Sequence, residues 1–436
     1  MHMQFSSFAQ RIAVSTLLPR HAVSMQEKVN IGFLAPLSGP VSSWGKPGLN
    51  GCHIWQDWLN NAGGILIDGK RYPVEIHAYD CEYDPQRAKA GAKHLVQDCN
   101  IHFLMMLGGE SYSQLNTYLV ENKILTSTLL PSDLSAETRY LIAPSEIHPF
   151  YNVTAVDWIK RAKPHVKTVA LCSQNDALGR PSLATYRAAF RVAGIEIVHE
   201  AIYDPSDPSA AKIVDPMLAA QPDLLCWCSS YTPMVHAMTE HAFHREYSGE
   251  ILSCTLDDYA KLIAKTSIEF VEGIIFQFPD FDDPKLRKKA FFFNQPQMFY
   301  SEYNRRFPNN WSAVSWEFAA VLDVWHAAVE KVGSTNSISV LAAMKSMGQF
   351  KNAFGRAQWW GTELLGVDNA LVGDWPVVTI QNGKAQIVEF GSVPKWLAKH
   401  TNILKQEFQK NGQLWRQRVE SGDTSSPINA RSLPKP

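Results

Sequence analysis

Apolar runs and amphipathic stretches alternate regularly along the chain from residue 29. The apolar run "VNIGFLAP" precedes the stretch 50–64, in which Ile54, Trp58 and Leu59 recur at helical spacing. The same alternation of strand-like and helix-like segments continues for several more units. Strands separated by helices predict βαβ units, and hence a parallel sheet covered by helices on both faces.

Local signals mark the ends of two of these helices. The pair Gly63–Gly64 follows the first helical stretch and suits a carboxy-terminal cap, because glycine readily adopts a left-handed backbone conformation. Asp84 is placed to cap the next helix at its amino end, with Pro85 at the first helical position. Both signals support the helical assignment of the segments that they bound.

The alternation restarts after residue 148 and predicts a second parallel sheet. The predicted strands are 168–174, 196–203 and 223–230, and the predicted helices are 149–162, 179–194, 210–221 and 232–246. Three further helical stretches follow at 295–307, 313–333 and 338–348. The pattern is that of an α/β protein with more than one sheet.

The last part of the chain has a different character. Between residues 355 and 391 we expect antiparallel strands, with Asn382–Gly383 as a hairpin turn. From about residue 396 we expect a polar helix, followed by a frayed end that is rich in serine and proline.

Composition and charge exclude several classes of protein. The 436 residues are 45% hydrophobic and 19% charged, as expected for a soluble globular protein of two or three packing units. The 41 Lys and Arg residues nearly balance the 42 Asp and Glu residues, so nothing in the charge recruits nucleic acid or an anionic membrane. No apolar run is long enough to span a bilayer.

Motifs for catalysis, cofactors and metals are missing. The glycine loops that bind dinucleotides and phosphates are absent, as is the nucleophile elbow of hydrolases. His241 and His244, with His236 nearby, lack the spacing of a zinc-binding helix, and solvated histidines explain them better. Cys226 and Cys228 share one face of a strand, where buried thiols are favoured over a metal or redox pair. We therefore predict no catalytic residue, no cofactor and no metal.

Four segments carry motifs in a characteristic order. The loop "PLSGPVSSWG" (36–45) joins the first strand to the first helix. Segment 60–98 combines a glycine pair, a strand, an Asp-Pro and an amphipathic helix, and is followed by a strand and turn at 101–113 and a longer α/β stretch at 168–229. Together they resemble the type I periplasmic solute-binding proteins of ABC transporters, in the branch that binds Leu/Ile/Val and amides. The similarity runs from about residue 29 to about 395.

This resemblance implies an α/β fold of two doubly wound parallel-sheet lobes joined by a three-stranded hinge, with the ligand bound between the lobes. Lobe 1 is expected at 29–147 plus 276–354, and lobe 2 at 148–275 plus 355–395. Residues 396–436 would form a helical tail. Hinge closure around a ligand would present the closed form to a membrane permease.

The amino terminus bears on the cellular compartment. Residues 1–28 contain Arg11, a short apolar core from Ile12 to Leu18 and a small-x-small site at Ala22–Ser24. These features fit a weak or degenerate signal peptide, with a cytosolic tail as the alternative. Together with the resemblance, they predict a periplasmic protein, and a cytoplasmic sensor of the same fold is the alternative.

In lobe 1 the resemblance places Trp44, Gly109, Glu110, Ser111 and Ser132 at the ligand. Trp44, in the loop before the helix, would wall off an apolar part of the ligand, with surface packing as the alternative. Gly109 stands where the family has a hydroxyl residue that grips the ligand carboxylate, and Ser111 is the nearest replacement. Glu110 either pairs with a cationic ligand group or only favours a helix start. Ser132 either contacts the ligand or caps a helix.

In lobe 2 the resemblance places Tyr231 and Asp257 in the cleft. Asp257 lies where an acidic residue holds the α-ammonium group of amino acids in the family. Asp258 is its neighbouring competitor, and a turn-forming aspartate is the alternative. Leu178 replaces a family tyrosine, which indicates a ligand other than a branched-chain amino acid.

The cysteines depart from the family pattern. The seven are too scattered for a disulfide scaffold. The family's disulfide in lobe 1 would join Cys81 to position 108, which is glycine here, and Cys81–Cys99 is the remaining pairing. A missing disulfide would favour a cytosolic relative.

The resemblance and the missing catalytic motifs together predict a solute-binding protein, not an enzyme, that feeds an ABC importer. Its expected partners are a small-molecule ligand (an amino acid, an amide or an aromatic acid) and an ABC permease, with no nucleic acid. A cleft carboxylate and aromatic faces would both attract a cation. The alternatives are a cytosolic ligand sensor that controls a regulatory partner and, third, an enzyme, for which no nucleophile–base pair can be named.

Overall fold

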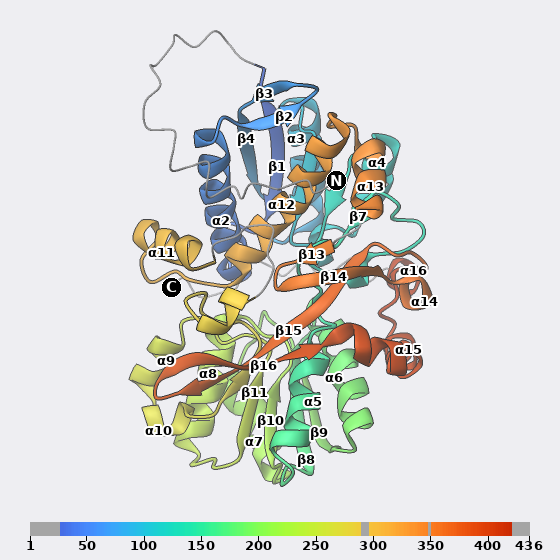
Figure 1. The fold of residues 1–436 in the computed structure, drawn as a ribbon. Coiled ribbons are helices and arrows are strands. Elements are labelled where there is room, and N and C mark those ends of the chain that lie inside the picture. Colours follow the sequence, from blue (N-terminus) through green and yellow to red (C-terminus); the bar gives the residue numbers. More distant parts are fainter. Residues whose placement is uncertain (1–26, 289–295, 348–349, 421–436) are drawn as a thin grey trace.

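Lobe 1 is built on a five-stranded parallel sheet, shown in the upper half of Figure 1. The computed structural model describes residues 27–288, 296–347 and 350–420, so nearly all of the predicted signal peptide lies outside the described residues. The strands, in sheet order, are β4 (Val74–Asp80), β1 (Val29–Ala35), β5 (Phe103–Met106), β6 (Thr126–Ser127) and β7 (Leu141–Ile142), beside a hairpin of β2 (Ile65–Ile67) and β3 (Lys70–Tyr72).

The helices of lobe 1 come from two distant parts of the chain. They are α2 (Ser42–Asn61), α3 (Pro85–Gln97), η1 (Gly109–Ser111), α4 (Asn116–Glu121), η2 (Pro131–Asp133), α11 (Pro296–Arg306), α12 (Val314–Val332) and α13 (Ser337–Ser346). Helix α12 packs closely on α2 because Gly51 leaves room for the backbone of Ser315, whose oxygen would lie 2.2 Å from a Cβ at that position.

Lobe 2 is built on a nine-stranded mixed sheet. Its parallel strands are β9 (Glu196–Tyr203), β8 (Thr168–Gln174), β10 (Leu224–Trp227), β11 (Glu250–Ser253) and β12 (Ile275–Phe276). Its helices are α5 (Asn152–Ala162), α6 (Gly179–Ala193), α7 (Ala210–Ala219), α8 (Thr232–His244), α9 (Tyr259–Lys265) and α10 (Ile268–Val271), with η3 (Pro284–Lys288) after β12. The two-lobed α/β fold predicted from the sequence is confirmed; the residue boundaries of the lobes stay a prediction.

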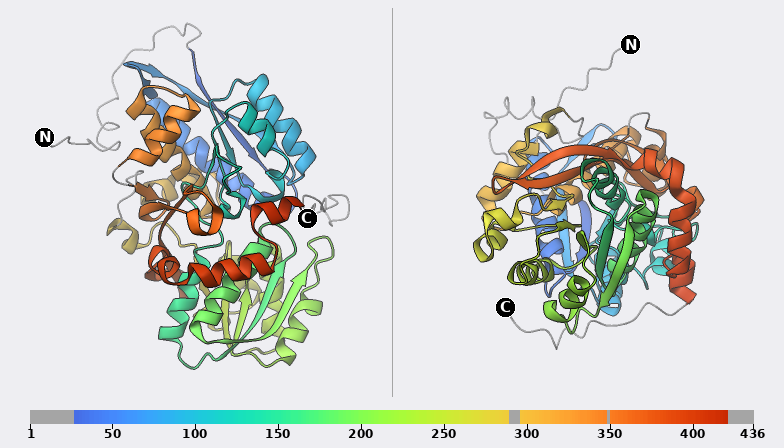
Figure 2. Two further views of the ribbon diagram at one scale, coloured as in Figure 1. Left: turned by 90° about the vertical axis from the view of Figure 1, so that its right-hand side faces the viewer. Right: turned by 90° about the horizontal axis from the view of Figure 1, so that it is seen from below.

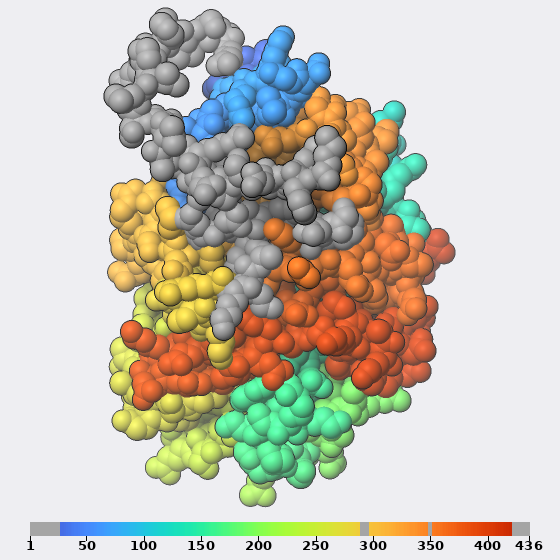
Figure 3. Space-filling view, in the orientation of Figure 1, coloured from blue at the N-terminus to red at the C-terminus, as the bar shows by residue number. Residues whose placement is uncertain are grey.

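A long strand joins the two lobes. β15 (Ala370–Gln381) pairs with β12 in lobe 2, and its first residue bridges to Ala143, just after β7 of lobe 1. The antiparallel strands β13 (Phe350–Asn352), β14 (Gly355–Trp360) and β16 (Lys384–Ser392) complete this region, with α14 (Thr362–Leu365) between β14 and β15. Together they form an orange and red band across the waist of the molecule (Figure 3).

A helix is found where one was expected from about residue 396, but one of its faces is apolar and buried. Helix α15 (Val393–Lys410) packs on α6 of lobe 2, because Leu397, Leu404 and Phe408 recur on one face and are fully buried. Helix α16 (Trp415–Glu420) lies against lobe 1, where the rings of Trp415 and Tyr112 are 5.5 Å apart. Figure 2 shows the two red helices side by side at the level of the waist. Residues 421–436 lie outside the described part.

Several local predictions are confirmed and one is wrong. Gly63 and Gly64 have positive φ at the end of α2, the side chain of Asp84 caps α3, and Asn382–Gly383 forms the turn between β15 and β16. Trp44, however, lies in the first turn of α2 and not in a loop, because the turn that begins at Gly39 (φ +74°) starts the helix at Ser42.

All seven cysteines are free thiols, so neither disulfide considered from the sequence is present. The sulfur atoms of Cys226 and Cys228 are 4.0 Å apart and buried. Among the described residues, no group of His, Cys, Asp and Glu is arranged to hold a metal ion. No helix in the described ranges has the length and apolar character needed to cross a membrane.

Candidate functional site

A small pocket lies between the two lobes, close to the carboxyl ends of the strands of both sheets. Its volume is about 30 Å³, which is room for one or two water molecules. Residues from lobe 1, lobe 2 and the segments that connect them contribute to its wall. They are Trp44, Leu107, Leu129, Leu130, Glu146, His148, Tyr151, Leu178, Ser229, Ser230, Cys254, Thr255, Phe278 and Val314.

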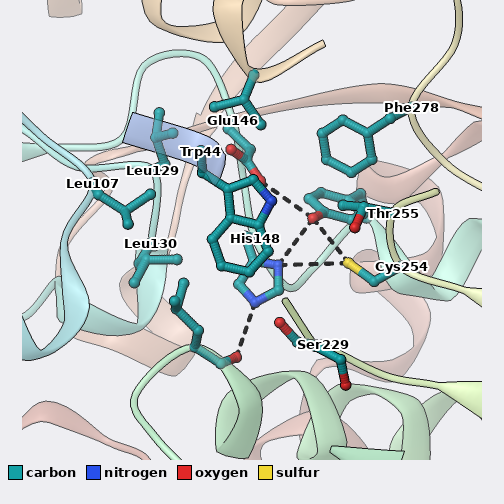
Figure 4. A pocket seen from close by; sticks show the side chains of 14 residues that line it. Trp44, Leu107, Leu129, Leu130, Glu146, His148, Ser229, Cys254, Thr255 and Phe278 are labelled. Carbon is teal, nitrogen blue, oxygen red and sulfur yellow. Dashed lines mark hydrogen bonds between the residues drawn. The ribbon is translucent and has the colours of Figure 1, made fainter. Parts of the chain in front are cut away.

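The pocket has an apolar side and a polar side (Figure 4). Leu107, Leu129 and Leu130 gather on one side of the Trp44 indole. Polar groups from lobe 2 and from the connecting segment after β7 lie on the other side, together with the ring of Phe278. The pocket therefore suits a small ligand that is apolar at one end and polar at the other.

The polar side is one hydrogen-bonded network. His148 contacts the carbonyl of Leu178 through Nε2 (3.0 Å) and the hydroxyl of Tyr151 through Nδ1 (2.9 Å). Because a carbonyl only accepts, Nε2 carries the hydrogen and Nδ1 is an acceptor. The hydroxyl of Tyr151 also lies 3.2 Å from Oε1 of Glu146 and 3.3 Å from Sγ of Cys254. Its single hydrogen can be donated to Nδ1 of His148 or to Oε1 of Glu146, but not fully to both at once.

The protonation states of this network argue against catalysis. Burial lowers the pKa of His148 to about 4 and raises that of the Cys254 thiol. Both groups are therefore neutral near pH 7, although Sγ and Nδ1 are only 4.0 Å apart. A nucleophilic cysteine needs a thiolate, which a neighbouring imidazolium would stabilise. The arrangement can hold a polar ligand group, but it does not activate a nucleophile.

Trp44 and Tyr231, which the sequence placed on opposite sides of the cleft, are in contact. Their ring centroids are 5.8 Å apart, and Trp44 belongs to lobe 1 whereas Tyr231 begins α8 of lobe 2. The hydroxyl of Tyr231 donates to Oδ2 of Asp176 at 3.0 Å. Trp44 lines the pocket, whereas Tyr231 contacts its ring without lining the pocket.

The turn after β5 is occupied by protein carboxylates. The N–H of Gly109 donates to Oδ2 of Asp133 at 2.8 Å, so a side chain of this protein fills the position expected for a ligand carboxylate. Glu110 accepts from the N–H of Ala177 in lobe 2 at 3.0 Å and thus links the lobes directly. Burial and the charge of Asp176 raise the pKa of Glu110 to about 8.

The three remaining candidates do not line the pocket. The hydroxyl of Ser111 lies 3.4 Å from Sγ of Cys81, inside lobe 1. Among the residues that the structure describes, the hydroxyl of Ser132 finds no hydrogen-bond partner within 3.5 Å and caps no helix. Asp257 accepts from Thr232 at 3.4 Å, and burial raises its pKa to about 7. The ligand roles of the seven candidates remain predictions.

Sequence reasoning missed two ionisable residues near this site, Arg418 and Glu146. Arg418 of α16 is buried and donates to Oδ1 of Asp133 at 2.9 Å and to the carbonyl of Ser132 at 3.2 Å. No local signal marks the pair of Arg418 and Asp133. Asp133 lies in a short turn, and Arg418 lies in the tail, for which no tertiary contact was expected. Glu146 was also missed, since it sits in an irregular connection between the lobes.

The comparisons with known proteins agree with this geometry. The family model for periplasmic binding proteins matches residues 28–385. The chain belongs to the periplasmic binding protein family. Its members are binding proteins and not enzymes, which agrees with the absence of catalytic motifs from the sequence.

Curated relatives of this periplasmic binding protein match part of its length. A Leu/Ile/Val-binding protein of Rhizobium johnstonii is 28% identical over 204 residues, which cover 45% of this chain and 53% of that protein. Leu/Ile/Val-binding protein homolog 3 of Brucella melitensis is 27% identical over 198 residues, with 44% and 52% covered. The chain thus spans about half the length of the curated relatives that it matches.

Solved structures show the same fold. A leucine-binding protein of Thermotoga maritima has a TM-score of 0.68 at 16% identity and covers 84% of this chain and 99% of its own. A solute-binding protein of Rhodopseudomonas palustris in complex with 3,4-dihydroxybenzoic acid has a TM-score of 0.69 at 17% identity, with 84% and 98% covered. This likeness confirms the type I periplasmic binding protein fold.

Proposed function

We propose that this protein is the solute-binding component of an ABC importer and captures a small amino-acid-like, amide or aromatic-acid ligand between its lobes. The observation that supports this most directly is the pocket, whose wall combines residues of both lobes with the segments that connect them. Such a site forms only when the lobes meet, so ligand binding and hinge closure are coupled. The closed form is the one that a membrane permease would recognise, in the periplasm.

Two contacts between the lobes support a closing motion. Glu110 accepts from the N–H of Ala177, and the ring of Trp44 lies against that of Tyr231. With these contacts made, a pocket of about 30 Å³ is too small to hold an amino acid, so the lobes must close less far around a bound ligand than they do here. Entry of a ligand therefore requires the lobes to separate.

The candidate residues divide by their place in the closed form. Trp44 walls the pocket, Tyr231 supports its ring, and Glu110 and Asp257 supply carboxyl groups near the boundary between the lobes. Gly109, Ser111 and Ser132 do not line the pocket, so they affect ligand binding only through the shape of the turns in which they lie. These ligand classes are in line with neighbours of the same fold, which include a leucine-binding protein and proteins in complex with isoleucine and 3,4-dihydroxybenzoic acid.

A melting-temperature screen with amino acids, amides and aromatic acids tests this function. A ligand at a hundred times its Kd stabilises the folded state by about 2.7 kcal/mol, which raises the Tm measurably. Trp44→Ala should abolish the shift, whereas Trp58→Ala, on the same helix but outside the pocket, should retain it. No shift with any of the three ligand groups would reject the ligand assignment.

A cytosolic sensor is the second candidate, and the free cysteines favour it. Six of the seven thiols are buried and none is paired, as is usual for proteins of a reducing compartment. Cell fractionation separates the two functions. Recovery in the periplasm with the first residues removed supports transport, and recovery in the cytosol with residues 1–28 intact supports the sensor.

A further inference from the structure

Three carboxyl groups from separate parts of the chain come together beside the pocket. Glu146 follows β7 and lines the pocket, Asp257 follows β11, and Glu317 lies in the first turn of α12, one turn after the lining residue Val314. Glu317 is fully buried and Glu146 is 6% exposed. Burial is the main cause that raises the pKa of both glutamates, and the negative charge of Asp257 adds to it, so the three groups form one electrostatic cluster.

Polar atoms around this cluster lack hydrogen-bond partners. In the described part of the chain, both carboxyl oxygens of Glu317, Nε1 of Trp44 and the hydroxyl of Ser230 make no hydrogen bond within 3.5 Å. Glu317 does approach Glu146, Trp44 approaches Asp257 and Ser230 approaches Tyr203, closely enough to influence the pKa values of Glu146, Asp257 and Tyr203. Trp44 and Ser230 line the pocket and are 6% and 2% exposed. Buried polar groups are almost always paired, so these atoms point to a polar ligand.

In the described part of the chain, the hydrogen-bond partners of Glu146 and Asp257 are uncharged hydroxyls and another carboxyl group. Glu146 contacts the hydroxyl of Tyr151 and the carboxyl of Glu317, and Asp257 contacts the hydroxyls of Thr232 and Ser312. Removing carboxylates from water without a cationic partner is costly. A ligand that brought a positive charge would offset this cost.

The other titratable groups that face the cluster cannot supply that charge. Burial lowers the pKa of His148 and raises those of Tyr151 and Cys254, so all three are neutral near pH 7. Arg418, a buried basic side chain of α16, is already bound to Asp133.

We propose that Glu146 and Glu317 bind a positively charged group of the ligand, an ammonium or an amidinium, while the leucine side of the pocket holds its apolar body. This inference rests on the proposed function and decides among its ligand classes. It favours amines, amidines and amino-acid amides, and it disfavours anionic aromatic acids. The indole N–H of Trp44 is a donor on the pocket wall, so it suits a carbonyl or another acceptor next to the charged group.

Proton linkage gives this inference a distinctive signature. Burial, with the charge of Asp257, raises the pKa of Glu146 to about 7, so this group is partly protonated in the free protein at neutral pH. A cationic ligand favours the ionised carboxyls, and binding releases protons. Affinity for a cation therefore rises with pH, by about tenfold between pH 6 and pH 8 for one such group. Affinity for an anion changes in the opposite direction.

Three planar ligands that share a phenyl ring test the sign of the charge: benzamidine (cation), benzamide (neutral) and benzoate (anion). Calorimetric titration of the full chain at pH 6, 7 and 8 measures Kd and proton exchange. We expect benzamidine to bind at least tenfold more tightly than benzoate, with affinity that rises with pH. The pair L-leucinamide and L-leucine, which differ by one net charge, should rank in the same way.

Neutral variants test the two glutamates. Glu146→Gln and Glu317→Gln should each weaken benzamidine binding at least tenfold and flatten its pH dependence, without lowering the Tm, because each removes an uncompensated buried carboxyl. The matched control is Asp323→Asn, which removes another buried carboxyl of α12 that accepts from Trp55 at 2.7 Å, outside the pocket. This variant should keep both the affinity and its pH dependence.

The outcomes separate the inference from the proposed function. Tighter binding of benzoate than of benzamidine, or benzamidine affinity that falls as pH rises, overturns the cationic site but leaves the solute-binding function standing. Unchanged benzamidine affinity in both Gln variants also overturns it. If none of the five compounds binds and the wider ligand screen is negative as well, the proposed function fails together with the inference.

Discussion

The ion pair between Arg418 and Asp133 gives a sharp test of how the carboxy-terminal helix contributes to stability. Its nitrogen and oxygen are 2.9 Å apart, and the two side chains are 8% and 0% exposed. Arg418→Met removes the cation, retains most of the apolar bulk, and leaves the Asp133 carboxyl buried without its charge partner. Breaking a buried pair in this way costs about 3–5 kcal/mol. We therefore expect a large fall in the free energy of unfolding.

The assay is equilibrium unfolding in urea, in which the shift in midpoint at unchanged slope reports the loss of stability. Burial already raises the pKa of Asp133, and Arg418 is the largest of the influences that lower it. Without Arg418 this pKa rises further. A carboxyl with a raised folded-state pKa loses its favourable contribution as pH rises, so the variant should be more destabilised at pH 7 than at pH 5.

Two variants show whether the missing charge is the cause. Arg416→Met, on the same helix, removes a solvent-exposed pair with Glu137 and should barely move the midpoint. Asp133→Asn combined with Arg418→Met removes the unpaired carboxylate, and this double variant should be more stable than Arg418→Met alone. Equal effects of the Arg416 and Arg418 variants would refute the reasoning.

Three further predictions concern single positions. Gly109→Ala should lower the free energy of unfolding by about 1–3 kcal/mol in thermal unfolding, because φ is +68° and a Cβ would lie 2.4 Å from the Tyr83 hydroxyl oxygen. The control Gly194→Ala has a similar φ (+72°) but open space around the Cβ, so it should cost less. Equal losses of stability in the two variants would contradict this reasoning. The pKa of Glu110 is raised to about 8, so its contribution to stability is lost between about pH 4.5 and 8. Glu110→Gln should flatten the fall in Tm over that range, and an unaltered pH profile would count against it. A thiol reagent should label one cysteine quickly in the native protein, and Cys99→Ser should remove that reaction; rapid labelling that survives this change would contradict the burial of the other six.

The regular part of the fold could be predicted because its pattern is local. The predicted strands 168–174 and 196–203 are found as β8 and β9 with the same bounds. Each strand is an apolar run between two helices whose ends are clear. The residues that show the run and the helix ends lie within a few positions of each element. Short elements such as β6 and β13, which have few residues to show a period, are fixed by their neighbours in the sheet.

The candidate site was only partly accessible from the sequence. The contact between Trp44 and Tyr231 agrees with the predicted placement of both residues in the cleft, which came from resemblance and not from pattern. The resemblance also marked Gly109 as a departure from the family. It could not show that Asp133 accepts from that N–H, or that Arg418 neutralises Asp133. These partners lie far apart in the sequence, and only the folded chain brings them together.

Helices α15 and α16 also limit how far the lobes can move apart. Asn411, at the end of α15, bonds to Arg187 of lobe 2, whereas Trp415 packs on Tyr112 of lobe 1. The four residues between these helices, 411–414, reach at most about 14 Å when fully extended. A small opening stretches this tether, and a wider one must pull α16 away with Arg418. A truncated chain that ended at residue 395, where the family resemblance ends, would therefore lack this tether, and only the direct contacts between the lobes, such as that of Glu110 with Ala177, would oppose opening.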